Sequence, residues 1–105
     1  MGKPYVLPTQ PGEGIRDMAA DGDTLLLILG PTGQWKTPPA RLARWNPATG
    51  DLVPIHAKGF KHIDNPEGIA PDPEGRLLIC QDQKAPISKP ILFRLELRKG
   101  DDVQE

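Results

Sequence analysis

The chain has 105 residues, of which 13 are basic and 14 acidic, and its formal net charge is −1. A chain of this length is expected to form one small domain, here residues 1–105. Its charge balance shows none of the basic excess that nucleic-acid binding requires, so no nucleic-acid partner is expected.

Thirteen prolines and 11 glycines are spread between short apolar runs. Proline breaks helix interiors, so this pattern predicts an all-β fold with many turns and almost no helix. No apolar run approaches the ~20 residues of a membrane span, and no secretory signal opens the chain. The sequence therefore predicts a soluble, cytoplasmic protein without a membrane partner. The single cysteine, Cys80, lies in an apolar run and is expected in the core.

Residues 13–56 carry the signals of four consecutive strands. The first two flank the hairpin turn Asp21-Gly22, and the third alternates apolar and charged side chains. The fourth contains Pro54, which suits an outer strand. These strands are expected at 15–20, 24–29, 41–45 and 51–56. The segment is thus predicted to form a four-stranded antiparallel unit.

Residues 67–105 repeat the same order of signals. Glu67-Gly68-Ile69 follows Glu13-Gly14-Ile15 after 54 positions (67 − 13), which is close to the period of propeller blades. An apolar run at 76–80 and an alternating strand at 91–97 come next. The fold class predicted is all-β, with two propeller-like four-stranded blades from a duplicated unit. Chance recurrence of Gly-Ile and Leu-Leu pairs is the alternative.

The second unit lacks a complete fourth strand, and Tyr5–Leu7 is expected to pair with the 91–97 strand and supply it. Propellers need about four to eight blades to close, so two blades require partners. Self-association would give a trimer with six blades or a tetramer with eight. The alternatives are that the chain is part of a longer propeller, or that it forms a single sandwich or barrel.

Four segments together resemble a family of bacterial β-propeller proteins of unknown function. They are Gly14–Ala19, Leu27–Thr32, Leu42–Trp45 and Asn65–Ala70. The run Pro-Glu-Gly-Ile-Ala, followed by a Leu-rich strand, is also similar to the esterase-like phytase propeller group. The resemblance covers roughly residues 14–97 and implies a propeller fold, although both families are much longer than this chain. The first family implies no established activity.

Glu13 and Glu67 would each precede the innermost strand of a blade, at the mouth of a central channel. In a closed oligomer they would form a ring of carboxylates, for which Ca²⁺ is a suitable ion. In the alternative interpretation, each glutamate accepts backbone hydrogen bonds and fixes a turn.

A second group of polar residues is expected to line a ligand pocket suited to a sugar or a phosphate. Its members are Arg16, Asp17, Trp35, Lys36, Asp82 and Lys84. Alternatively, Trp35 packs between blades and the lysines remain solvated. Arg44 and Arg94 lie at equivalent positions and are expected to pair with neighbouring acids.

Two functional hypotheses follow. The first is a propeller-type module for assembly or ligand binding, with no catalysis by this chain alone. The second is a metal-dependent hydrolase of phosphate or carboxylic esters, in which Glu13 and Glu67 hold the metal, Arg16 anchors the anion and Asp82 acts as the base. The chain contains neither a Gly-x-Ser-x-Gly elbow nor a phosphate-binding Gly-Lys loop.

Overall fold

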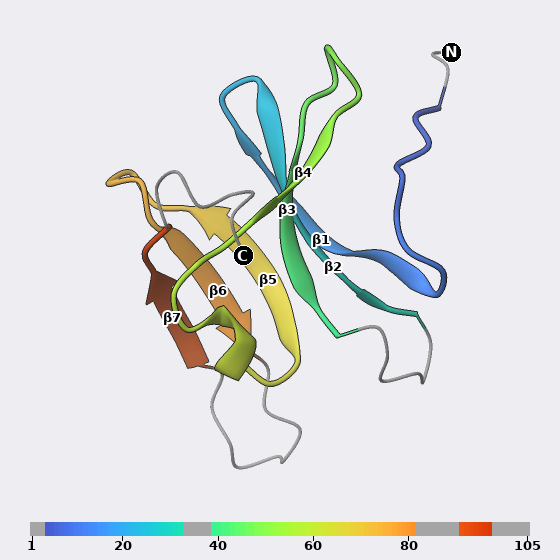
Figure 1. The fold of residues 1–105 in the computed structure, drawn as a ribbon. Helices are drawn as coiled ribbons and strands as arrows, with labels where there is room; N and C mark the ends of the chain where they lie inside the picture. The colour runs from blue at the N-terminus through green and yellow to red at the C-terminus, as the bar shows by residue number, and fades with distance from the viewer. Residues whose placement is uncertain (1–3, 33–38, 82–90, 98–105) are drawn as a thin grey trace.

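The computed structural model describes residues 4–32, 39–81 and 91–97. These residues form seven β-strands and one short 3₁₀ helix (Figure 1). In chain order the elements are β1 (Glu13–Asp21), β2 (Thr24–Pro31), β3 (Arg41–Trp45), β4 (Leu52–Ile55), η1 (Phe60–His62), β5 (Pro66–Pro71), β6 (Leu77–Gln81) and β7 (Ile91–Leu95). The predicted all-β fold is confirmed. No helix in the described part of the chain is long and apolar enough to cross a membrane.

The strands form two antiparallel sheets, each in chain order. The first sheet is β1-β2-β3-β4, and the second is β5-β6-β7. Gly22 has a φ of 61° in the two-residue loop between Asp21 and Thr24, a conformation that glycine adopts without strain. As predicted, β4 lies at the edge, where Pro54 costs no internal hydrogen bond. The described residues form no closed ring of sheets.

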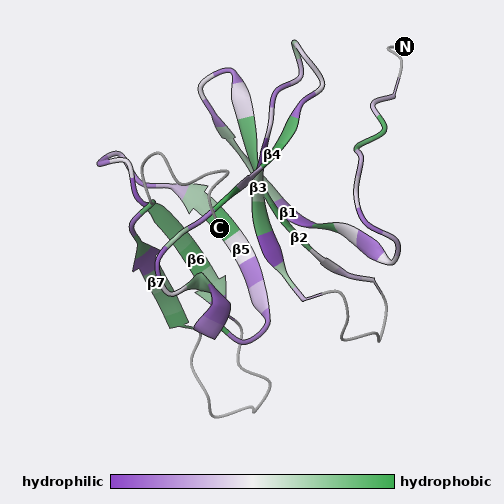
Figure 2. Ribbon diagram, viewed as in Figure 1, coloured by the Kyte–Doolittle hydropathy of each residue, from purple (hydrophilic) through white to green (hydrophobic). Residues whose placement is uncertain are grey.

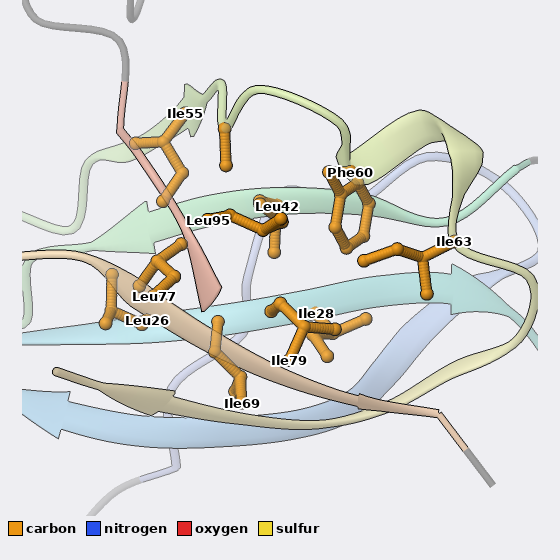
Figure 3. Close-up of a cluster of buried hydrophobic side chains, with 11 residues drawn as sticks. Leu26, Ile28, Leu42, Ile55, Phe60, Ile63, Ile69, Leu77, Ile79 and Leu95 are labelled. Carbon is orange, nitrogen blue, oxygen red and sulfur yellow. The ribbon is translucent and has the colours of Figure 1, made fainter. Parts of the chain in front are cut away.

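The two sheets share one apolar core (Figure 3). Because successive side chains of a strand point to opposite faces, Leu26 and Ile28 of β2 face the second sheet. Ile79 of β6 packs against them from the other side, and β6 is among the most apolar segments in Figure 2. The connection between the sheets closes the core through Ala57, Phe60 and Ile63.

A second apolar cluster lies on the opposite face of the first sheet. It contains Leu27, Leu29, Ala43 and Trp45, with Leu7, Leu25 and Leu52 packed against it. Since β2 contributes to both clusters, the side chains from Leu26 to Leu29 are at most 1% exposed. This explains why β2 is a continuous apolar run in the sequence.

The N-terminal segment covers part of this outer face. The ring of Tyr5 meets that of Trp45 edge to face, with centroids 4.9 Å apart, and Leu7 packs beside it. The expected pairing of Tyr5–Leu7 with residues 91–97 is therefore not found: the segment is not a strand, and β7 pairs with β6. The flanking Pro4 and Pro8 have no N–H to donate to a ladder, whereas Tyr5 and Leu7 gain an apolar surface.

The two sheets carry matching irregularities. A bulge places Arg16 between Ile15 and Asp17 in β1, and another places Glu67 between Pro66 and Gly68 in β5. Between the bulge and the hairpin, the strand pairing in the first sheet matches that in the second sheet residue by residue. The matched positions are Ala20 with Pro71, Leu25 with Leu77, Leu26 with Leu78, Arg44 with Arg94, and Trp45 with Leu95.

This register corrects the alignment of the two Glu-Gly-Ile copies. Glu67 corresponds in position to Arg16, not to Glu13, which lies earlier in β1. A carboxylate and a guanidinium therefore occupy the matching bulges. Cys80 also differs from its expected place: it is only partly buried, because it alternates with the core residue Ile79.

Candidate functional site

An ion pair joins the bulges of the two sheets where β1 lies against β5. Arg16 Nη2 donates to Glu67 Oε1 at 2.8 Å, and their side chains are 25% and 37% exposed. Arg16 also donates from Nε to the carbonyl of Pro66 at 3.2 Å and from Nη2 to Asn65 Oδ1 at 3.3 Å. One guanidinium thus binds three successive residues: Asn65, which precedes β5, and the first two residues of that strand.

Asp17 reinforces this junction from the next position along β1. Its Oδ2 accepts the backbone N–H of Ile69 at 2.8 Å, so the first sheet binds the backbone of β5 directly. The structure therefore brings together Arg16 and Asp17, which were predicted to line a ligand pocket, and Glu67, which was predicted to bind a metal. All three join one sheet to the other.

Gly30 makes room for the Arg16 side chain. A Cβ atom built at Gly30 would lie 2.7 Å from Arg16 Cδ and 3.6 Å from the Cα of Ala40. Carbon atoms do not approach to 2.7 Å without displacement, so a larger residue would push the guanidinium away from β5. The contact between Arg16 and β5 therefore requires glycine at position 30.

Glu13 lies apart from this network and has its own guanidinium partner. Its side chain is 0% exposed, and Arg41 binds both carboxylate oxygens, from Nε at 2.7 Å and from Nη2 at 3.0 Å. The N–H of Gln10 also donates to Oε1 at 3.0 Å. The hydrogen bonds from Arg41 lower the pKa of Glu13 against the opposing effect of burial, and they raise the pKa of Arg41.

Both glutamates that were predicted to hold Ca²⁺ therefore have arginine partners. Across residues 4–32, 39–81 and 91–97, no group of three or more His, Cys, Asp or Glu side chains could hold a metal ion. Glu13 matches the alternative interpretation, in which a glutamate fixes a turn, because it binds the backbone of Gln10. The Ca²⁺ site stays a prediction without geometric support in this part of the chain.

Four of the six residues predicted to line a ligand pocket lie outside the described residues. They are Trp35, Lys36, Asp82 and Lys84. The other two, Arg16 and Asp17, are engaged at the junction between the sheets. The pocket thus stays a prediction, and so does the role of Asp82 as a base.

Arg44 and Arg94 bind acids at the hairpins of their own sheets, as predicted. Arg44 Nη1 lies 2.8 Å from Asp21 Oδ2 and donates to Thr24 Oγ1 at 2.8 Å. Arg94 Nη1 lies 3.6 Å from Asp72 Oδ2 and 3.4 Å from Glu74 Oε1. In both sheets, an arginine of the third strand thus forms an ion pair at the hairpin that joins the first two strands.

The sequence analysis missed Arg41 and Asn65. The alternation of residues 41–45 placed Arg41 on one face of a strand but did not identify the carboxylate beside it. Asn65 is the only non-glycine residue in the described segments with positive φ, at 55°, a conformation that asparagine tolerates. The sequence signal that could have identified Asn65 is its residue type directly before Pro66, at the start of the strand that carries the Glu67 bulge.

Exchanging the charges of the junction should reveal the Arg16–Glu67 interaction. We expect Arg16→Glu to lower the free energy of unfolding by about 1 kcal/mol, because two carboxylates then face each other at a partly exposed site. The double variant with Glu67→Arg should recover part of that loss, measured by urea denaturation at low salt. A double variant that loses the sum of the two single effects would show that the pair is not coupled.

No family model matches the chain, and neither a curated protein nor a solved structure matches it. Its function therefore has to be inferred from its own geometry. In the described residues, every buried side-chain nitrogen or oxygen has a hydrogen-bond partner. The ion pairs described above join strands, hairpins and sheets.

Proposed function

We propose that this chain is an assembly module of the β-propeller type, in which each sheet is a blade-like unit and the outer faces bind further copies. The observation that carries the proposal is the direction in which the two sheets stack. The front face of a sheet is the one that bears Arg44 or Arg94, and the back face is the opposite one.

The front face of the first sheet lies in the shared core. Leu26 pairs with Arg44, and Ile28 pairs with Leu42, so these residues project on the same side. Leu26, Ile28 and Leu42 are all in the core between the sheets. Arg44 therefore lies on the same face of the first sheet as these buried core residues.

The second sheet contributes its back face to the same core. Leu77 pairs with Leu95 and Ile79 pairs with Phe93, and these residues pack in the core, whereas Arg94 pairs with Leu78 on the opposite side. The sheets therefore stack front to back. A symmetric sandwich would bury matching faces and be complete with two sheets, whereas a front-to-back stack can continue at both ends.

Both ends of this two-sheet stack expose apolar side chains. On the back face of the first sheet Ile15 is 48% and Met18 56% exposed, and on the front face of the second sheet Leu92 is 66% exposed. Leu92 lies beside the partly buried Leu78 and Cys80 on that face, so each outer face carries more than one apolar side chain. Apolar patches of this kind indicate surfaces that bind a partner. Front-to-back contacts between copies close into a ring when the rotation allows it.

The matching bulges, hairpins and arginines support duplication of one ancestral unit, and the resemblance to propeller families supports the blade interpretation. Since about four to eight blades close a propeller, three copies with six units or four copies with eight would suffice. The remainder of a longer propeller could serve the same purpose. Ligand binding would be secondary to this assembly.

Sedimentation velocity over a concentration series tests the proposal. The wild-type chain should sediment as a species larger than a monomer, and Leu92→Lys should shift it towards the monomer because a charge then has to be desolvated on the docking face. Ala48→Lys introduces the same charge in an exposed turn and should change nothing. A wild-type chain that is monomeric at every concentration would refute self-assembly.

A further inference from the structure

We infer that a second copy of this chain docks with the back face of its first sheet on the front face of the second sheet, and that Glu67 of one copy pairs there with Arg16 of the next. This inference rests on the proposed assembly function and specifies its interface. The result is a repeating contact in which guanidinium and carboxylate groups alternate around the axis of the assembly.

The junction within the chain provides the geometry for this contact. The front of the first sheet packs on the back of the second, and the bulge residues Arg16 and Glu67 meet beside the core at 2.8 Å. If the stack continues in the same direction, the unit after the second sheet is the first sheet of another copy. Its bulge residue is again Arg16, which then lies beside Glu67.

Glu67 is suited to a second guanidinium. Within the described part of the chain it accepts from Arg16 through Oε1, and its side chain is still 37% exposed. A carboxylate has two oxygens and can accept from two arginines. The alternating order also removes the repulsion of a ring of glutamates, so no bound cation is required to relieve it.

The apolar parts of the two outer faces also match the internal junction. Cys80 of β6 occupies the position of Ile28, which is 0% exposed in the core, and Met18 of β1 occupies the position of Ile69. Ile28 and Ile69 belong to the same cluster in Figure 3. In the docked pair, Met18 of one copy would therefore lie close to Cys80 of the other.

The N-terminal segment covers part of this docking surface. Within the chain β5 lies against β1 and β2, but Ile79 of β6 and Leu95 of β7 also pack in the core between the sheets. Their counterparts on the back face of the incoming first sheet are Leu27 and Trp45. Tyr5 and Leu7 cover the region of Trp45 in β3, whereas Ile15 and Met18 of β1 remain about half exposed at 48% and 56%. A second copy that docks as the second sheet does within the chain therefore displaces Tyr5 and Leu7 from this region.

Disulfide formation in the full-length Met18→Cys variant tests the inference, because Cys80 is the only native cysteine. Under mild oxidation, the new thiol should bond to Cys80 of a neighbouring copy and give a ladder of covalent multiples on a non-reducing gel. A bond within one chain is not expected, since positions 18 and 80 lie on opposite outer faces of the stack. Peptide mapping identifies the 18–80 bond.

Three further variants serve as controls. If Met18→Cys does not fold, Ile15→Cys provides a second position on the same face. Ala48→Cys lies away from that face and should give no ladder. Glu67→Arg should suppress the ladder, because two guanidinium groups would then repel each other at the contact between copies. A Cys80–Cys80 dimer in the wild type would overturn the inference in favour of a symmetric contact. The absence of every bond in a chain that still assembles would overturn this interface alone, whereas a monomer would refute the proposed function as well.

Discussion

Arg41→Met should lower the free energy of unfolding by about 2–3 kcal/mol at neutral pH, because it leaves the buried carboxylate of Glu13 without its guanidinium. Methionine retains much of the apolar stem of arginine, so the loss reports mainly on the ion pair. Urea denaturation followed by circular dichroism measures it. Arg76→Met, which removes a guanidinium from an exposed pair with Glu74, should change stability by less than about 0.5 kcal/mol.

The Glu13–Arg41 pair should also make the free energy of unfolding depend on pH in acid. The pKa of Glu13 in the folded chain is lowered from its ordinary value of 4.5, chiefly by the hydrogen bonds from Arg41. A lowered pKa contributes stability that is present above the unfolded-state value and is lost as the pH falls through the folded-state pKa. Wild-type stability should therefore fall below about pH 4.5, and Glu13→Gln should remove this component of the decline. An unchanged acid transition in that variant would contradict the assignment.

Ile79→Ala should cost about 2–4 kcal/mol, because Ile79 is 0% exposed at the centre of the core between the sheets. The loss should affect both sheets. Native-state amide exchange should accelerate in β2 as well as in β6, since the two strands pack on each other across one core. Val6→Ala, at a side chain that is 92% exposed, should have an effect below about 0.5 kcal/mol.

Faster exchange confined to β5, β6 and β7 would contradict the shared core. It would show that the first sheet is stable on its own, supported by its second apolar cluster around Leu27 and Trp45. The strands in which Ile79→Ala accelerates exchange thus distinguish a common core from two independent sheets.

The strands themselves could be predicted from the sequence because their signals are local. Asp21-Gly22 marks a tight hairpin, and the continuous apolar run of β2 reflects burial on both faces. Pro54 correctly placed β4 at an edge. Each of these features depends on residues within one strand or one turn.

How the two sheets pack on each other could not be predicted from such local signals. The bulges at Arg16 and Glu67 add a residue without a distinctive sequence signal, so matching the Glu-Gly-Ile triplets aligned Glu13 with Glu67 and missed the true register. The pairing of Arg16 with Glu67 depends on tertiary packing between residues far apart in the chain. For that reason the sequence did not predict that Glu67 would have an arginine partner within the chain.

The N-terminal segment shows a related limit. Tyr5–Leu7 has the residue types of a strand, but its side chains pack on Trp45 and the nearby cluster instead of joining β7. Residue type favoured a strand at this position. It did not indicate which of two sheets would receive it.

The mass of the wild-type chain in solution, measured by light scattering over a concentration series, tests most directly the claim that front-to-back stacking continues between copies. The account predicts a single closed species of three or four times the 11.5 kDa chain mass, with no further growth as concentration rises. A persistent dimer would indicate a symmetric contact, and a monomer at every concentration would contradict the central claim outright.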